Sequence, residues 1–271
     1  MAWSELRIKS WAEFDAEVLE KHLQATRPLR YTYVYRGQSD SAWGLEPSLT
    51  RLCLSLGLDR TRATEVEAAV LKRFQQRAHL YLPPHLIPEV GLLDWWTLMQ
   101  HYRAPTRILD WSHSPLVALY FAVNERWDAD GVVWLFQRYY LSQGSIEKYG
   151  EIPEMGPVLD DEEWFRLAEP PPRIVPFDRV RLTERMVAQQ GTFTVAQDVL
   201  LNHASGLEAV LPEPAQMRPG TIELHRGKVV VPRALKKDLL RRLHQMNITA
   251  DALFPGVDGL GAELEEVIRL L

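Results

Sequence analysis

Arg36 is the first side chain whose type and position could bind a ligand. It ends a run of aromatic and β-branched residues, Tyr31 to Tyr35, and Gly37 and Gln38 follow it. A guanidinium carries a fixed fork of donors that suits phosphate or carboxylate. A glycine has no Cβ atom, so it lets a ligand or another backbone segment approach closely. The alternative is an Arg36 that only pairs with a buried aspartate.

Residues 100–114 form the richest polar stretch, placed between two apolar segments. Polar groups there are expected to be partly buried, and buried polar groups need partners. His101 could donate a hydrogen bond to a ligand or act as a base, and Ser114, at the start of an apolar helix, could face a phosphate. Alternatively, His101 bonds to the backbone and Arg107 forms an internal ion pair with Asp110.

Gln189-Gln190-Gly191 is the third polar stretch, and it precedes an expected strand. Carboxamides donate and accept hydrogen bonds together, so they could hold a nicotinamide, a base or a ribose. The alternative is a turn in which Gly191 supplies a positive φ and both glutamines are exposed.

The composition excludes several classes of protein. The chain has 271 residues and a net charge of −5, which argues against a globally basic nucleic-acid binder but leaves a local basic patch open. Its one cysteine, Cys53, cannot form an intramolecular disulfide, so we expect a reducing, cytoplasmic compartment. The spacing of His and Cys predicts no metal site, and no apolar run is long enough to predict a membrane span.

The elements that must position these polar stretches follow from apolar periodicity and capping. Helices are predicted over residues 11–22, 64–80, 93–101, 114–123, 232–246 and 262–271. Strands are predicted over residues 31–35, 106–111, 131–136, 174–175 and 192–195 and within 221–231. Residues 138–172 are polar, acidic and Pro-rich, which predicts a surface excursion. Without regular βαβ alternation, the expected fold class is α+β: one domain over residues 1–271, with a mixed or antiparallel sheet and flanking helices.

The ordered motifs of the chain resemble those of the FRG domain family, named for a Phe-Arg-Gly signature. The signature reads Tyr35-Arg36-Gly37 here. The similarity continues at Gln100-His101-Tyr102, Pro105-Thr106-Arg107, Leu109-Asp110-Trp111 and Gln189-Gln190-Gly191. Together the motifs place the FRG-like core at about residues 25–265.

The chain also resembles the ADP-ribosyltransferase fold. Those enzymes place an Arg or His on a first strand, a Ser or Thr at the end of the next, then an Ala-rich helix, and a Glu on a late strand. The order here is Arg36, Ser112, a helix with Ala118 and Ala122, and Gln190. The resemblance implies cleavage of the nicotinamide–ribose bond of NAD, bound as a substrate without a metal. ADP-ribose would pass to an acceptor such as a protein, a nucleobase or water, as in a toxin or phage-defence effector with a possible antitoxin partner.

The resemblance also implies roles for individual residues. Arg36 would hold the pyrophosphate, His101 or Thr106 the ribose, and Gln190 the acceptor or the ribose. The remaining expected NAD-binding residues are Gly37, Gln38, Tyr102, Ser114 and Gln189.

Two other functions remain open at this stage. No Glu stands at the late-strand position, where Gln189-Gln190-Gly191 lies, and this favours a module that binds a nucleotide or nucleic acid without turnover. A third interpretation is a scaffold whose polar cluster is purely structural.

Overall fold

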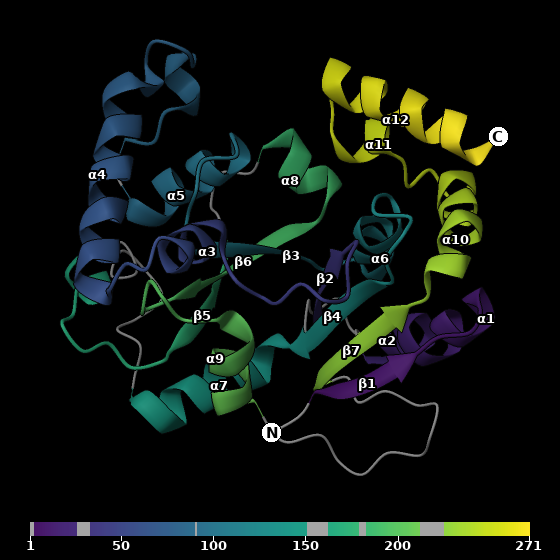
Figure 1. The fold of residues 1–271 in the computed structure, drawn as a ribbon, viewed down its shortest axis with the longest axis horizontal. Helices are drawn as coiled ribbons and strands as arrows, with labels where there is room; N and C mark the ends of the chain where they lie inside the picture. The colour runs from purple at the N-terminus through teal and green to yellow at the C-terminus, as the bar shows by residue number, and fades with distance from the viewer. Residues whose placement is uncertain (1–2, 26–32, 90, 151–161, 179–182, 212–224) are drawn as a thin grey trace.

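The computed structural model describes residues 3–25, 33–89, 91–150, 162–178, 183–211 and 225–271, which form a seven-stranded sheet covered by helices (Figure 1). The strand order is β1-β7-β4-β2-β3-β6-β5. β1 and β7 are parallel and every other neighbouring pair is antiparallel. The strands are β1 (Ser4–Arg7), β2 (Tyr33–Gln38), β3 (Ile108–Ser112), β4 (Gly131–Gln137), β5 (Ile174–Phe177), β6 (Gly191–Ala196) and β7 (Arg226–Val231). The predicted α+β class and mixed sheet are therefore confirmed.

The helices come from every part of the described chain. The first is bent, because a π-helical turn over Asp15–Leu19 joins α1 to α2. The helices are α1 (Trp11–Phe14), α2 (Glu20–Ala25), α3 (Ser48–Ser55), α4 (Arg60–Ala78), α5 (Leu92–His101), α6 (Pro115–Val123), α7 (Arg138–Tyr149), α8 (Glu184–Ala188), α9 (His203–Val210), α10 (Arg233–Gln245), α11 (Ala250–Leu253) and α12 (Val257–Leu270). Short 3₁₀ turns lie at Pro84–Leu86 and Glu162–Phe165.

Side-chain alternation along the strands divides the core between the two faces of the sheet. On β4, Val133 and Leu135 pack with α6 and α10, whereas Val132 and Phe136 belong to the cluster under α7 and α9. The cluster formed by α4 and α5 covers the β3-β6-β5 half, with Trp96 at its centre. Burial on both faces explains why β4 reads as a continuous apolar run rather than an alternating one.

Helix α6 lies directly on the sheet, and two glycines make this possible. The side-chain oxygen of Ser114 accepts a hydrogen bond from the backbone N–H of Val117, so the helix starts where its cap predicts. A Cβ added at Gly37 in β2 would lie 1.8 Å from the backbone oxygen of Ala118, and one at Gly131 would lie 2.1 Å from that of Ala122. Gly37 therefore serves close approach of a backbone segment, one of the two roles expected for it.

Strands β2 and β3 separate soon after they meet. β2 is registered with β4 over all six of its residues, from Tyr33 to Gln38. It is registered with β3 only where Tyr35 faces Ser112. Beyond that point the guanidinium of Arg36, rather than backbone pairing, links β2 to β3.

Several sequence predictions differ from the structure. Residues 138–149 form helix α7 and Glu162–Phe165 a 3₁₀ turn, so the expected surface excursion over 138–172 is partly helical. Its middle, residues 151–161, lies outside the described residues. α3 and β1 were not predicted, because eight-residue and four-residue elements show too little periodicity.

Candidate functional site

A single large cavity collects most of the polar residues singled out in the sequence. Its volume is about 1420 Å³, and it opens at the end of β2, between α6, α8 and α12. Twenty-five residues line it: Arg36, Gly37, Gln38, Ser39, Ala42, Trp43, Gly44, Glu46, Arg51, His101, Tyr102, Arg103, Tyr120, Phe121, Asn124, Glu125, Arg126, Arg185, Phe254, Pro255, Asp258, Ala262, Glu265, Glu266 and Arg269.

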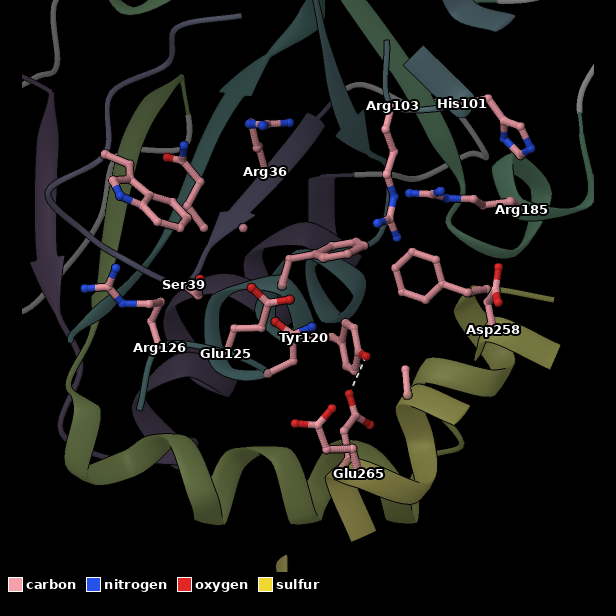
Figure 2. Close-up of a pocket in the computed structure, with 18 of the residues that line it drawn as sticks. Arg36, Ser39, His101, Arg103, Tyr120, Glu125, Arg126, Arg185, Asp258 and Glu265 are labelled. Atoms are coloured by element: carbon pink, nitrogen blue, oxygen red, sulfur yellow. Dashed lines mark hydrogen bonds between the residues drawn. The ribbon is translucent and has the colours of Figure 1, made fainter. Parts of the chain in front are cut away.

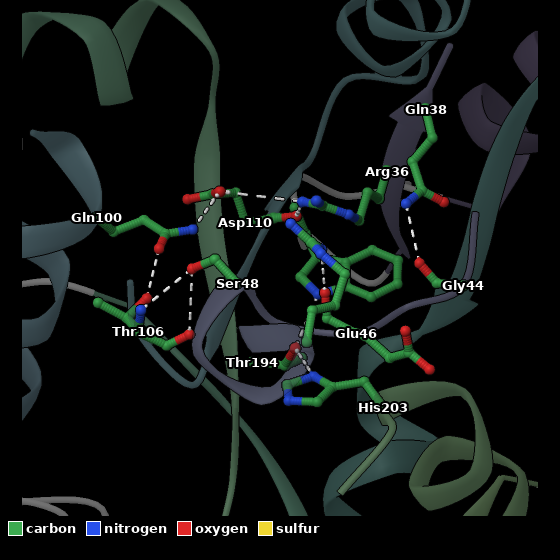
Figure 3. Close-up of polar contacts among 12 residues, drawn as sticks. Arg36, Gln38, Gly44, Glu46, Ser48, Gln100, Thr106, Asp110, Thr194 and His203 are labelled. Carbon is green, nitrogen blue, oxygen red and sulfur yellow. Dashed lines mark hydrogen bonds and ion pairs between the residues drawn. The ribbon is translucent and has the colours of Figure 1, made fainter. Parts of the chain in front are cut away.

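Arg36 lies in the gap between β2 and β3. Its Nη1 donates a hydrogen bond to the backbone oxygen of Asp110 at 2.7 Å and lies 3.9 Å from the carboxylate of the same residue (Figure 3). The Asp110 side chain is 51% exposed, so it neutralises Arg36 only weakly. Within the described part of the chain, Nε of Arg36 has no acceptor. Arg36 nevertheless lines the cavity with 22% of its side chain exposed, so a bound anion could approach the guanidinium.

Burial and like charges both destabilise the charged form of Arg36. Burial lowers its pKa, Asp110 opposes this, and the nearby Arg51 lowers the pKa further. An arginine stays protonated at neutral pH despite such shifts. The lowered pKa thus indicates that a bound anion would stabilise the charged form of Arg36.

Further arginines surround Arg36 at the same end of the cavity. Figure 2 shows Arg36, Arg103 and Arg185 on one side of the cavity, with His101 close to Arg185. Burial lowers the pKa of Arg185, and Asp110 raises it. Arg103 lowers the pKa further, so the guanidinium groups of Arg103 and Arg185 lie close enough to repel each other. This end carries an excess of positive charge, which attracts anions.

The opposite end of the cavity carries Glu125, Glu265 and Glu266 beside Arg126 and Arg269, and a buried hydrogen-bond chain holds its wall. The Tyr120 hydroxyl donates to Oε1 of Glu266, and Nε2 of His244 lies 2.9 Å from Oε2 of the same carboxylate. Tyr120 belongs to α6, His244 to α10 and Glu266 to α12. The chain of contacts fixes α12 as a cavity wall, while Glu125 and Glu265 also face the cavity at this end (Figure 2).

Aromatic side chains line the cavity between the two charged ends. Trp43 and Tyr102 are each 45% exposed, and Phe121 packs edge-on against Phe254 at 5.9 Å. The guanidinium of Arg185 lies 4.7 Å from the centre of the Phe254 ring. Exposed aromatic faces next to cations are suited to stacking a planar ring.

Five of the predicted site residues lie together in the cavity wall: Arg36, Gly37, Gln38, His101 and Tyr102. Both polar atoms of the Gln38 side chain are used within the protein: Nε2 donates to the oxygen of Gly44 (Figure 3), and Oε1 accepts from Nε1 of Trp134. His101 ends α5, and its ring packs edge-on against Tyr102 at 4.8 Å. Arg36, His101 and Tyr102 are therefore the members of this set best placed to meet a ligand.

Thr106 and Ser114 are not among the residues lining the cavity. Thr106 is fully buried, its hydroxyl donates to Oε1 of Gln100, and its backbone N–H donates to Ser48 Oγ at 3.1 Å (Figure 3). Ser114 caps α6, and its own N–H donates to Ser112 Oγ at 2.9 Å. Both side chains organise backbone segments, so the roles expected for them at a ribose and a phosphate find no geometric support.

Gln189 and Gln190 also lie outside the cavity lining. Nε2 of Gln189 donates to the backbone oxygen of Leu253 at 3.0 Å, which ties α8 to α11. Gln190 is exposed and has a φ of 48°, so the left-handed residue of this turn is Gln190 and not the expected Gly191. The backbone oxygen of Gln190 accepts from the N–H of His113 at 3.0 Å. The three polar stretches therefore do not all meet at one cavity.

The expected ion pair between Arg107 and Asp110 is wrong. Arg107 is fully buried and makes a two-point contact with Glu67 of α4, with Nε at 2.7 Å from Oε1. Its Nη1 also donates to the oxygen of Gln197 at 2.7 Å. Asp110 instead accepts from Nε2 of Gln100 at 2.8 Å. Side chains three positions apart along an extended segment point to opposite faces, so Arg107 and Asp110 cannot share a face.

Most of the acidic and aromatic wall was not identified from the sequence. Arg185 and Glu266 stand on α8 and α12, and Phe254 directly follows α11; each has the type of an ordinary surface or core residue. The signal that could have found part of this wall is the end of the FRG-like pattern, Leu253-Phe254-Pro255 and Asp258-Gly259, which includes the cavity-lining Phe254 and Asp258. Among the described residues, no group of His, Cys, Asp and Glu is arranged to hold a metal ion.

Comparison with protein families gives a match to one segment of the chain, and this segment contributes the cavity-lining residues that come first in the sequence. Residues 31–131 match the model of the FRG domain. No curated protein and no solved structure matches the chain. The FRG segment, as residues 31–131 are called below, is narrower than the span of about 25–265 expected from the motifs. It contains Arg36, His101 and Tyr102, whereas Gln190 and α12 lie beyond it.

The FRG segment contains β2, α3, α4, α5, β3 and α6. It therefore supplies the cavity-lining residues from Arg36 to Arg126. No helix in the described residues has the length and apolar character needed to cross a bilayer.

Proposed function

We propose that the cavity binds NAD and that the protein transfers ADP-ribose from it to an acceptor, with release of nicotinamide. The observation that carries this proposal is the guanidinium of Arg36, which lies at the cavity and is only weakly neutralised by the half-exposed Asp110. NAD has a pyrophosphate flanked by two planar rings. The cavity has arginines at one end and exposed aromatic side chains in the same wall.

The arginine end suits the pyrophosphate. Arg36, Arg51, Arg103 and Arg185 all line the cavity. The one carboxylate that influences both Arg36 and Arg185 is Asp110, which is half exposed. Hydrogen bonds from charged donors to phosphate are about twice as strong as neutral ones, so a diphosphate is the expected occupant.

The aromatic part suits the rings. Trp43 and Tyr102 expose large aromatic surfaces to the cavity rather than burying them in the core. Stacking of a base on such a side chain contributes roughly 1–3 kcal/mol. The volume of about 1420 Å³ leaves room for a dinucleotide together with part of an acceptor.

The arrangement of the sheet supports the chemical part of the proposal. The strand with Arg36 is next to the strand that ends at Ser112, and that strand is next to β6, which begins after Gln190. Ser112 is followed by α6, with Ala118 and Ala122 against the sheet. These neighbours follow the order of the ADP-ribosyltransferase resemblance, which is an argument from analogy.

A second candidate is a module that binds the nucleotide without turning it over. The placement of Gln189 and Gln190 outside the cavity favours it, because neither side chain reaches the site where an oxocarbenium-like state would form. In this case the acceptor, a protein or a nucleic acid, would be a binding partner only.

Incubation of the protein with NAD and candidate acceptors separates these functions. We expect release of nicotinamide by the wild type. Replacement of Arg36 by Gln should weaken NAD binding about ten- to hundredfold, since a hydrogen bond to a charged group contributes roughly 1.5–3 kcal/mol. The matched control is Arg62→Gln, because Arg62 is exposed on α4 and pairs only locally with Glu65.

Circular dichroism must show that both variants are folded, because Arg36 also bonds to the backbone of β3. NAD binding that is lost in Arg36→Gln, without any nicotinamide release by the wild type, would favour the binding module. If calorimetry detected no binding of NAD or ADP to the folded wild type, both candidates would be excluded.

A further inference from the structure

Lys236 is a buried cation that bonds to three backbone carbonyl groups. It lies on α10, and none of its surface is exposed. Its Nζ lies 2.7 Å from the oxygen of Ser39, 3.0 Å from that of Glu125 and 2.9 Å from that of Arg126. Among the described residues, no carboxylate lies within ion-pair distance of it. All three donors of the ammonium group are therefore used on backbone oxygens.

The residues that supply these oxygens all belong to the cavity wall. Ser39 directly follows β2, and Glu125 and Arg126 lie in the turn between α6 and β4. Lys236 itself is not among the residues lining the cavity. Lys236 thus joins the two wall segments to α10 from outside the cavity. It is separated from each segment by roughly a hundred residues of sequence or more.

The turn at Arg126 is a backbone conformation that needs support. Its φ is 46°, which residues with a side chain rarely adopt. The Arg126 side chain reaches Asp40 at 3.3 Å and lies over the ring of Trp43 at 6.0 Å. Lys236 binds the carbonyl group of this same strained residue, so its bond helps to fix the position of the Trp43 side of the cavity.

We propose that Lys236 is a positioning residue of the ligand cavity, whose ammonium group holds the end of β2 and the α6–β4 turn at the spacing that the ligand requires. A protonated lysine supplies three donors, whereas the neutral amine supplies two. Loss of the proton therefore releases at least one wall carbonyl and weakens the remaining bonds. Ligand affinity should fall when Lys236 loses its charge.

The charge of Lys236 is sensitive to pH near neutrality. Burial lowers its pKa to about 8, against opposing contributions from Asp40, Asp128 and Asp130, while Arg126 lowers the pKa further. These groups face Lys236 from the segment after β2 and from the α6–β4 turn. Lys236 accordingly loses its charge as the pH rises through about 8.

The effects of pH on binding and on stability have opposite signs. The pKa of Lys236 is lower in the folded protein than its ordinary value of 10.5. Between these values the unfolded chain holds the proton that the folded protein has released, so this residue's contribution to stability increases as pH rises. Binding should therefore fall over the interval in which this residue's contribution to stability rises, so weaker binding at high pH would not reflect a general loss of stability.

The test compares the wild type with Lys236→Met and with the control Lys237→Met, which changes the next residue of α10. Amide hydrogen exchange of residues 39–44 and 124–130, expressed as protection factors, measures the wall directly. We expect protection in the wild type and in Lys237→Met at about pH 7, several-fold lower protection in the wild type at about pH 9.5, and low protection in Lys236→Met at both.

Binding of ADP, followed by calorimetry at the same two pH values, gives the functional readout. We expect several-fold weaker binding by the wild type at the higher pH, with a melting temperature that does not fall in parallel, and pH-independent weak binding by Lys236→Met. Equal wall protection in wild type and Lys236→Met at neutral pH would overturn the proposal. If Lys236→Met does not fold, an unchanged wall in the wild type between the two pH values would overturn it instead.

The inference rests on the proposed function only for the choice of ADP as probe. The exchange measurement needs no ligand. If protection of the wall falls at the higher pH while ADP binds at neither pH, the result would support Lys236 as a positioning residue. It would count only against a nucleotide as the ligand.

Discussion

Replacement of Gly37 by alanine should displace helix α6 and disrupt the cavity. The new Cβ atom would lie 1.8 Å from the backbone oxygen of Ala118 and 2.9 Å from the backbone nitrogen of Ala122. An ordinary contact needs about 3.4 Å, so the helix and β2 must separate by roughly 1.5 Å. Neither partner is the end of a flexible side chain, and interiors are packed too tightly to absorb such a shift locally.

The free-energy cost can be bounded from the neighbours of α6. Overpacking of a core by one methyl group costs roughly 1–3 kcal/mol when side chains can yield. Here two backbone segments must part, and α6 carries Val117, Leu119 and Tyr120, each at most 2% exposed, into the same cluster. We therefore expect a loss of about 3 kcal/mol or more, which lowers the melting temperature by roughly 6–12 °C in a protein of this size.

Gly44→Ala is the matched control. Gly44 also lines the cavity, but a Cβ there would meet its nearest atom, Nδ2 of Asn202, at an ordinary 3.6 Å. Its effect on stability should stay within about 0.5 kcal/mol. Thermal denaturation followed by circular dichroism measures both variants. A Gly37→Ala protein that melts with the wild type and binds ADP equally well would refute the close approach of α6 to β2.

Two further perturbations address buried polar contacts. Glu67→Gln should destabilise the protein by about 3–5 kcal/mol, because it leaves the buried Arg107 guanidinium uncompensated, whereas Glu65→Gln, on the exposed side of the same helix, should have little effect in denaturant titrations. Tyr120→Phe should cost about 1–3 kcal/mol, since the buried Glu266 carboxylate loses one of its two partners; a variant as stable as the wild type in urea would show that this contact does not hold α12 in place.

The sequence was informative where local chemistry decides structure. The cap at Ser114 and the apolar run behind it predicted α6, and the run from Gly131 to Phe136 predicted β4. Arg36 was singled out because a guanidinium beside a glycine at the end of a strand is an unusual combination, and it lies at the cavity.

The sequence was uninformative where partners come from distant segments. Nothing local indicates that Arg107 bonds to Glu67, forty residues earlier, rather than to Asp110. The same holds for Lys236, which resembles its solvated neighbour Lys237 in every local respect. At Gln190 the structure agrees with the alternative of an exposed turn, but the positive φ lies at Gln190 and not at Gly191, and the backbone oxygen of Gln190 makes the contact to His113.

The cavity is shared between two stretches of chain that can change separately. The floor and the first arginines come from residues 31–131, while Arg185, Phe254 and the wall of α12 come from the region after them. Substitutions on the cavity face of α12 would alter the shape and charge of this wall and leave the contacts of α6 with Gly37 and Gly131 in place. A scaffold divided in this way can keep one anchoring point for a common chemical group and acquire different selectivity by variation of its last helix.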